Sequence, residues 1–112
     1  MLKTNYLSNS DSGVFIGCFG NPGKNFEIRR DLAPSEELSR KYLNNKISFS
    51  KFKREYVKEL YVKRSILEKL TKQAEKEDIT LVCFEKNPEH CHRSILARVL
   101  KNINPKIQIC IK

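Results

Sequence analysis

The chain has 112 residues and a formal net charge of +9 at pH 7, from 22 Lys and Arg against 13 Asp and Glu. This length fits a single domain, and composition changes nowhere sharply enough to indicate a boundary, so we expect one domain over residues 1–112. Leu, Ile, Val and Phe account for 32 residues, enough to build a packed core, which excludes a disordered chain. The apolar runs are far shorter than the ~20 residues of a membrane helix, so we expect no membrane partner.

The positive charge is concentrated in the middle of the chain. Residues 24–64 contain 12 basic and six acidic residues, a balance of +6, whereas residues 1–23 are neutral and residues 65–112 carry +3. A basic surface attracts phosphate groups, either on small molecules or on nucleic acids. The same lysines also fit a solvated helix face, because Lys51 and Lys58 are interleaved with Glu55 and Glu59.

The N-terminus and the cysteines indicate a reducing compartment. The first residues contain neither the apolar stretch of a secretory signal nor the Arg-rich character of a transit peptide, so we expect a cytoplasmic protein. Cys18, Cys83 and Cys110 lie in apolar runs and fit buried, reduced thiols, and a disulfide framework is not expected. Cys91 differs, because it lies in the polar string NPEHCHR.

Three nearly continuous apolar segments predict β-strands, near residues 14–19, 79–84 and 107–111. Strands of this kind are typical of parallel sheets that are covered on both faces. The third segment also alternates, which fits an edge strand. Residues 20–34 contain several Gly and Pro and predict an exposed loop.

Helical periodicity and capping signals predict four helices, near residues 36–45, 51–62, 66–77 and 92–103. Ser35 is the expected N-cap of the first, and Ser65 with Glu68 has the spacing of a capping box for the third. The fourth lies between the last two strands, as a crossover helix does. The chain is therefore expected to form an α/β fold, a three-layer sandwich with a short, mostly parallel sheet.

Residues 81–100, LVCFEKNPEHCHRSILARVL, run from a predicted strand through a loop into a predicted helix. Ligands of open α/β sheets bind beyond the carboxyl ends of the strands, and a helix N-terminus favours anions. With Arg93 in the first helical turn and Lys86 in the loop, this junction predicts a binding site for a nucleotide or another phosphate-bearing molecule. We expect the side chains of Arg29 and Arg30 to face the same cleft.

The same junction contains groups that could carry out chemistry. Cys91 lies beside imidazoles, a guanidinium and a helix N-terminus, all of which favour a thiolate, so Cys91 and His92 are candidate catalytic residues. Glu85 is a candidate general base. The alternatives are that Cys91 is structural and that Glu85 is the ion-pair partner of a basic residue.

Several more specific catalytic and ligand-binding motifs are excluded, because the residues they require are missing or wrongly spaced. A tyrosine-phosphatase signature would need five residues and then Arg after the cysteine, but Ala97 occupies that position and Arg98 is one place late. The zinc-deaminase pattern lacks its second cysteine after Cys91. Phosphate-binding glycine loops are absent, and the Cys and His spacing matches no known zinc knuckle, so neither a cofactor nor a metal is predicted.

At these positions the sequence resembles the family catalogued as domain of unknown function 488. The resemblance covers residues 29–100 and is carried by residues 31–35 (DLAPS), 83–86 (CFEK) and 91–93 (CHR). It implies a small cytoplasmic α/β domain without an established activity. It also implies that five residues line the pocket, namely Cys83, Glu85, Cys91, His92 and Arg93.

Three functions therefore remain open at the level of sequence. The first is binding of a phosphate-bearing ligand at the strand-to-helix junction, where Cys83 and Arg93 would contribute. The second is a nucleic-acid-binding module that uses the basic central helices, with contacts from Lys51, Lys53, Arg54 and Lys58. The third is a thiol-dependent enzyme that uses Cys91.

Overall fold

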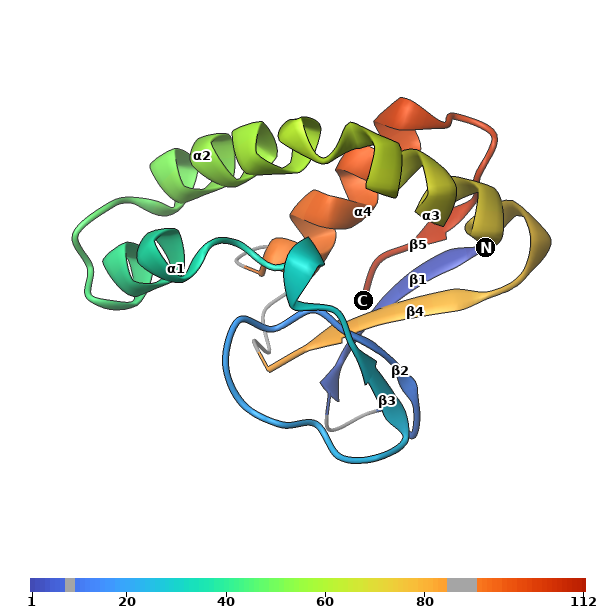
Figure 1. Ribbon diagram of the computed structural model, residues 1–112, viewed down its shortest axis with the longest axis horizontal. Helices are drawn as coiled ribbons and strands as arrows, with labels where there is room; N and C mark the ends of the chain where they lie inside the picture. The colour runs from blue at the N-terminus through green and yellow to red at the C-terminus, as the bar shows by residue number, and fades with distance from the viewer. Residues whose placement is uncertain (8–9, 85–90) are drawn as a thin grey trace.

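The computed structural model describes residues 1–7, 10–84 and 91–112, and it contains five parallel strands and four helices (Figure 1). The strands lie in the order β3-β2-β4-β1-β5. Their bounds are β1 Leu2–Tyr6, β2 Gly13–Phe15, β3 Phe26–Ile28, β4 Ile79–Cys83 and β5 Ile109–Cys110. Each pairing is parallel, so the predicted α/β fold with a parallel sheet is confirmed.

The three predicted strands are present but shorter than expected, and two further strands were not predicted. β1 is central, pairing with β4 on one side and β5 on the other, yet its sequence LKTNY has only one large aliphatic side chain. β3 lies inside the segment 20–34, for which a loop was predicted. That segment also contains a 3-10 helix, Arg30–Leu32, in which Leu32 is buried.

The four predicted helices are confirmed, with bounds α1 Glu36–Leu43, α2 Phe49–Val62, α3 Arg64–Lys76 and α4 His92–Ile103. Ser35 caps α1 as predicted, because its hydroxyl accepts a hydrogen bond from the Leu38 amide at 3.3 Å. The capping box predicted for the third helix is wrong. Ser65 lies inside α3, and Glu68 accepts a hydrogen bond from Arg64 Nε at 3.0 Å instead.

The helices gather on one side of the sheet (Figure 1). Leu2, Leu81 and Cys83 point to that side and belong to the core that the helices complete. Lys3 and Thr80 alternate with these residues and remain partly exposed on the opposite face. Among the described residues, all four helices lie on this side of the sheet, and no described helix covers the second face.

Within the described parts of the chain, every helix is too short or too polar to cross a membrane.

The two serines provide a matched test of helix capping. Ser35→Ala should lower the free energy of unfolding by about 1–2 kcal/mol, because α1 loses its cap. Ser35 also donates to Glu59 at 2.6 Å, and this hydrogen bond is lost too. Ser65→Ala should change the free energy of unfolding by less than about 0.5 kcal/mol, because Ser65 is exposed within α3. Urea unfolding of both variants checks this, and equal losses would contradict the assignment.

Candidate functional site

A cleft of about 260 Å³ lies at the carboxyl ends of β2 and β4. These strands are neighbours, with Phe15 opposite Val82, but the chain leaves them in opposite directions. Beyond β2 it leads to β3 at one edge of the sheet, and beyond β4 it leads through α4 to β5 at the other. In α/β proteins ligands bind where neighbouring connections diverge in this way, so the position of the cleft is typical of a binding site.

The walls of the cleft come from five parts of the chain and are mainly apolar. The loop after β2 and the end of β4 form one part of the lining, and α1, α2 and the start of α4 form the rest. The lining residues are Gly17, Cys18, Phe19, Ser39, Tyr42, Leu43, Phe52, Cys83, Phe84, Cys91 and His92. A small ligand with an apolar or aromatic group fits such a surface.

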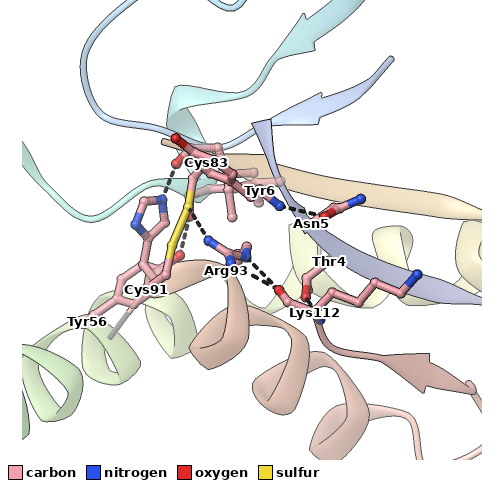
Figure 2. The surroundings of a disulfide bond; sticks show 11 residues. Thr4, Asn5, Tyr6, Tyr56, Cys83, Cys91, Arg93 and Lys112 are labelled. Atoms are coloured by element: carbon pink, nitrogen blue, oxygen red, sulfur yellow. Dashed lines mark hydrogen bonds between the residues drawn. A yellow bond between two sulfur atoms is a disulfide. The ribbon is translucent and has the colours of Figure 1, made fainter. Parts of the chain in front are cut away.

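Cys83 and Cys91 meet in this cleft and are joined by a disulfide (Figure 2). Cys83 ends β4, and Cys91 is the residue that precedes α4. The expectation that Cys83 is a reduced thiol and that no disulfide forms is corrected here, whereas Cys18 and Cys110 are free. The two Cα atoms are 7.8 Å apart, farther than in most disulfides, so the same backbone also holds two separate thiols side by side.

Arg93 lies fully buried behind the cysteine pair (Figure 2). Its NH1 group donates a hydrogen bond to Cys83 Sγ at 3.2 Å, and its Nε and NH2 groups donate to the Lys112 carbonyl oxygen at 3.2 and 3.0 Å. A guanidinium at this distance favours the thiolate form of a neighbouring cysteine. These donors face Cys83 and the end of the chain, and the role of Arg93 as a phosphate ligand stays a prediction.

His92 links α4 to the loop after β2. Its Nε2 atom lies 2.6 Å from the Ile16 carbonyl oxygen, to which it donates when the ring is neutral. Burial and, to a smaller extent, the charge of Arg93 lower the pKa of His92, and the bond to the Ile16 carbonyl raises it. The net result is a pKa of about 4. The ring is therefore neutral near pH 7, with the lone pair on Nδ1.

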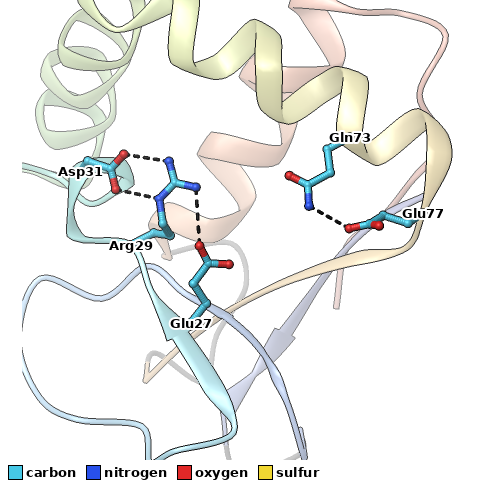
Figure 3. Close-up of polar contacts among 5 residues, drawn as sticks. All are labelled: Glu27, Arg29, Asp31, Gln73 and Glu77. Carbon is cyan, nitrogen blue, oxygen red and sulfur yellow. Dashed lines mark hydrogen bonds and ion pairs between the residues drawn. The ribbon is translucent and has the colours of Figure 1, made fainter.

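Arg29 and Arg30 have partners away from the cysteine pair. Arg29 forms two hydrogen bonds to Asp31, at 2.9 and 2.8 Å, and lies 3.9 Å from a Glu27 carboxylate oxygen (Figure 3). The hydrogen bonds between Arg29 and Asp31 raise the pKa of Arg29 and lower the pKa of Asp31. Arg30 donates to the carbonyl oxygens of Gly17 and Gly20, at 2.9 and 2.6 Å, and so fixes the loop that walls the cleft.

The structure thus brings Cys83, Cys91 and His92 together in the cleft and places Arg93 directly behind them. Arg30 lines a separate cavity, and Arg29 lines neither of the two. Glu85 and Lys86, the remaining predicted site residues, lie outside the described residues.

Sequence reasoning missed the cleft residues of α1 and α2 and the role of the loop after β2. Cys18 was interpreted as one of three buried thiols, but it lines the cleft and is partly exposed. The glycine at position 20 is the sequence feature that marks this loop. Gly20 adopts a φ of +91°, and a Cβ there would lie 2.5 Å from the Phe84 ring, so a glycine is required. This close approach brings the loop against the end of β4.

The family comparison agrees with the resemblance seen in the sequence. A family model described as "Active DUF488-N3 subclade" matches residues 8–104, most of the chain. Comparison with curated proteins and with solved structures found no significant match.

The low pKa of His92 predicts a pH-dependent stability. The unfolded chain takes up a proton near pH 6.5, whereas the folded chain stays neutral at this residue until about pH 4, so stability falls as the pH falls through this range. From pH 7 to pH 5, His92 should remove about 2 kcal/mol from the free energy of unfolding. His92→Gln should lose this part of the pH dependence.

The measurement is urea unfolding at both pH values, with a metal chelator present and the disulfide intact. A variant with the same pH dependence as the natural protein would contradict the assignment of a partly buried, neutral His92.

Proposed function

The chain belongs to the DUF488 family, and we propose that it is a thiol-dependent enzyme in which Cys83 and Cys91 exchange electrons with a small substrate in the cleft. The observation that carries this proposal is the contact of the two sulfur atoms within the wall of a cavity. A cysteine pair of this kind passes between dithiol and disulfide and so transfers two electrons. The description of the family model as active is compatible with a chemical role.

Cys83 is the better nucleophile of the pair. Its sulfur accepts a hydrogen bond from Arg93, and the positive charge there stabilises a thiolate after reduction. Cys91 is then the resolving cysteine, which attacks the intermediate formed on Cys83. His92 lines the same cleft, but its pKa of about 4 makes it a weak base, so the Cys91 thiol gives its proton to a departing substrate thiolate instead.

The proposed reaction is the reduction of a substrate disulfide. The Cys83 thiolate attacks one substrate sulfur, forms a mixed disulfide and expels the first substrate thiolate. Cys91 then attacks Cys83 Sγ, which breaks the mixed disulfide and expels the second substrate thiolate. The substrate gains two electrons. One product thiolate takes the proton of the Cys91 thiol, and the other takes a proton from solvent, to which Cys83 released its own when it became a thiolate. The protein ends with the Cys83–Cys91 disulfide, which a cellular thiol reduces again.

The cleft supports a small substrate with an apolar or aromatic part. Cys83 and Cys91 are each only 1% exposed, so a reagent reaches them through the cleft rather than from the open surface. Phe19, Leu43 and Phe84 line the same cleft and are 38%, 66% and 51% exposed. Exposed apolar side chains around a cavity favour an aromatic or aliphatic group over a strongly hydrated one.

Binding of a phosphate-bearing ligand and binding of nucleic acid both stay predictions. The Cys91 side chain does not cap α4, so a phosphate-bearing substrate would place its anion at the first-turn amides of α4, with Arg93 behind them. For nucleic acid, Lys51, Lys53 and Arg54 are exposed on α2. The thiol reaction is preferred because it uses groups that meet in one cavity.

An aromatic disulfide tests the proposed reaction directly. The probe is 4,4′-dithiodipyridine, applied to reduced protein in which Cys18 and Cys110 are replaced by Ser. We expect two molecules of thiopyridone to be released per chain, because the second cysteine resolves the mixed disulfide. The product should carry the Cys83–Cys91 disulfide and no adduct by mass spectrometry.

Two further variants separate the roles of the cysteines. Adding Cys91→Ser should stop the reaction after one release and leave an adduct on Cys83. Adding Cys83→Ser should slow the first release at least tenfold at pH 7, because the thiolate beside Arg93 is lost. If that variant reacts as fast as its parent, or if the parent keeps two adducts, the proposal is wrong.

A further inference from the structure

We infer that the reduced protein binds a zinc ion through Cys83, Cys91 and His92. The ligand atoms of these three residues all lie within 4.8 Å of one another. Two thiolates and an imidazole are ligands that zinc prefers. This inference rests on the reversible reduction of the cysteine pair proposed above, but it assigns a second use to the same residues.

The spacing of the ligands suits zinc once the disulfide is broken. In a tetrahedral site with Zn–S bonds of 2.3 Å, the two sulfur atoms lie about 3.8 Å apart. The ends of β4 and α4 hold the cysteine Cα atoms 7.8 Å apart, which leaves room for the sulfurs to separate by this amount. The site can therefore form without rearrangement of the strand or the helix.

The groups around the ligands match those of protein metal sites. A histidine that binds a metal usually donates its other ring N–H to a backbone carbonyl or a carboxylate, which orients the ring. His92 has such a bond, from Nε2 to the Ile16 carbonyl, and so keeps Nδ1 free to coordinate. Arg93 donates to Cys83 Sγ, as outer groups do toward a thiolate ligand.

Three protein ligands leave one position of a tetrahedral ion open. Sites of this composition bind a water or a substrate atom in the fourth position, whereas structural zinc sites use four protein ligands. All three residues line the cleft, so the open position would face the space that takes the substrate. A thiol product is a suitable fourth ligand, since zinc binds thiolate sulfur well.

Zinc binding and disulfide formation exclude each other because both use the same sulfur atoms. Oxidation of the two thiolates by a disulfide compound takes two electrons from the pair, forms the Cys83–Cys91 bond and releases Zn²⁺. Bound zinc should in turn block attack by Cys83. The spacing of these residues along the sequence predicted no metal, but it could not show that a strand end and a helix start bring them together.

Zinc binding is measured on the full chain, kept reduced with a phosphine, by competition with a chromogenic chelator. We expect one zinc ion per chain with a Kd below about 1 µM. Cys83→Ser and Cys91→Ser should each weaken binding at least 100-fold, and His92→Ala at least tenfold. Cys18→Ser, a change in the same cleft but outside the ligand set, and Cys110→Ser should leave it unchanged.

Cobalt gives a test that needs no substitution. Reduced natural protein with Co²⁺ should show thiolate-to-cobalt charge-transfer absorption, which oxidation by diamide abolishes as the metal is released. A Kd weaker than about 10 µM for zinc together with no charge-transfer band, or equal weakening by Cys110→Ser, would overturn the inference. Thiopyridone release without metal binding would refute this inference alone, whereas metal binding without release would refute the proposed redox function alone.

Discussion

A buried guanidinium holds the candidate site together. Arg93 is 0% exposed, and it joins the sulfur of Cys83, at the end of β4, to the carbonyl of Lys112, beyond β5. The Lys112 amide in turn donates to Thr4 on β1 at 3.0 Å. A buried charge is tolerated only with partners, so the positions of these three strands and of α4 depend on one another through Arg93.

The cleft follows from this arrangement and from the way the chain leaves the sheet. Because connections diverge after β2 and β4, the loop at residues 16–20 and the end of β4 face each other across a space that α1 and α2 close. His92 and Arg30 fix that loop by binding three of its carbonyl oxygens. The cysteine pair therefore lies opposite a loop that hydrogen bonds hold in place, with its two sulfur atoms in contact.

The sequence predicted the helices well and the site only in part. Residues 92–103 form α4 as predicted because the apolar stripe and the terminal Asn104 are local signals. β1 was missed because its burial alternates between Leu2 and Thr4, and a threonine gives no apolar signal. The types of Cys91 and Arg93 indicated reactive chemistry, but their partners depend on how α4 packs against β4, which no local pattern encodes.

We propose that Arg93 activates the Cys83 thiol, and the pH dependence of Cys83 alkylation tests this most directly. In reduced protein treated with iodoacetamide, mass spectrometry follows Cys83 and Cys110 separately, so that Cys110 serves as an internal reference. The account predicts that modification of Cys83 reaches half its maximal rate well below pH ~8.5, the value for an ordinary thiol. A half-maximal rate at or above that pH would contradict it.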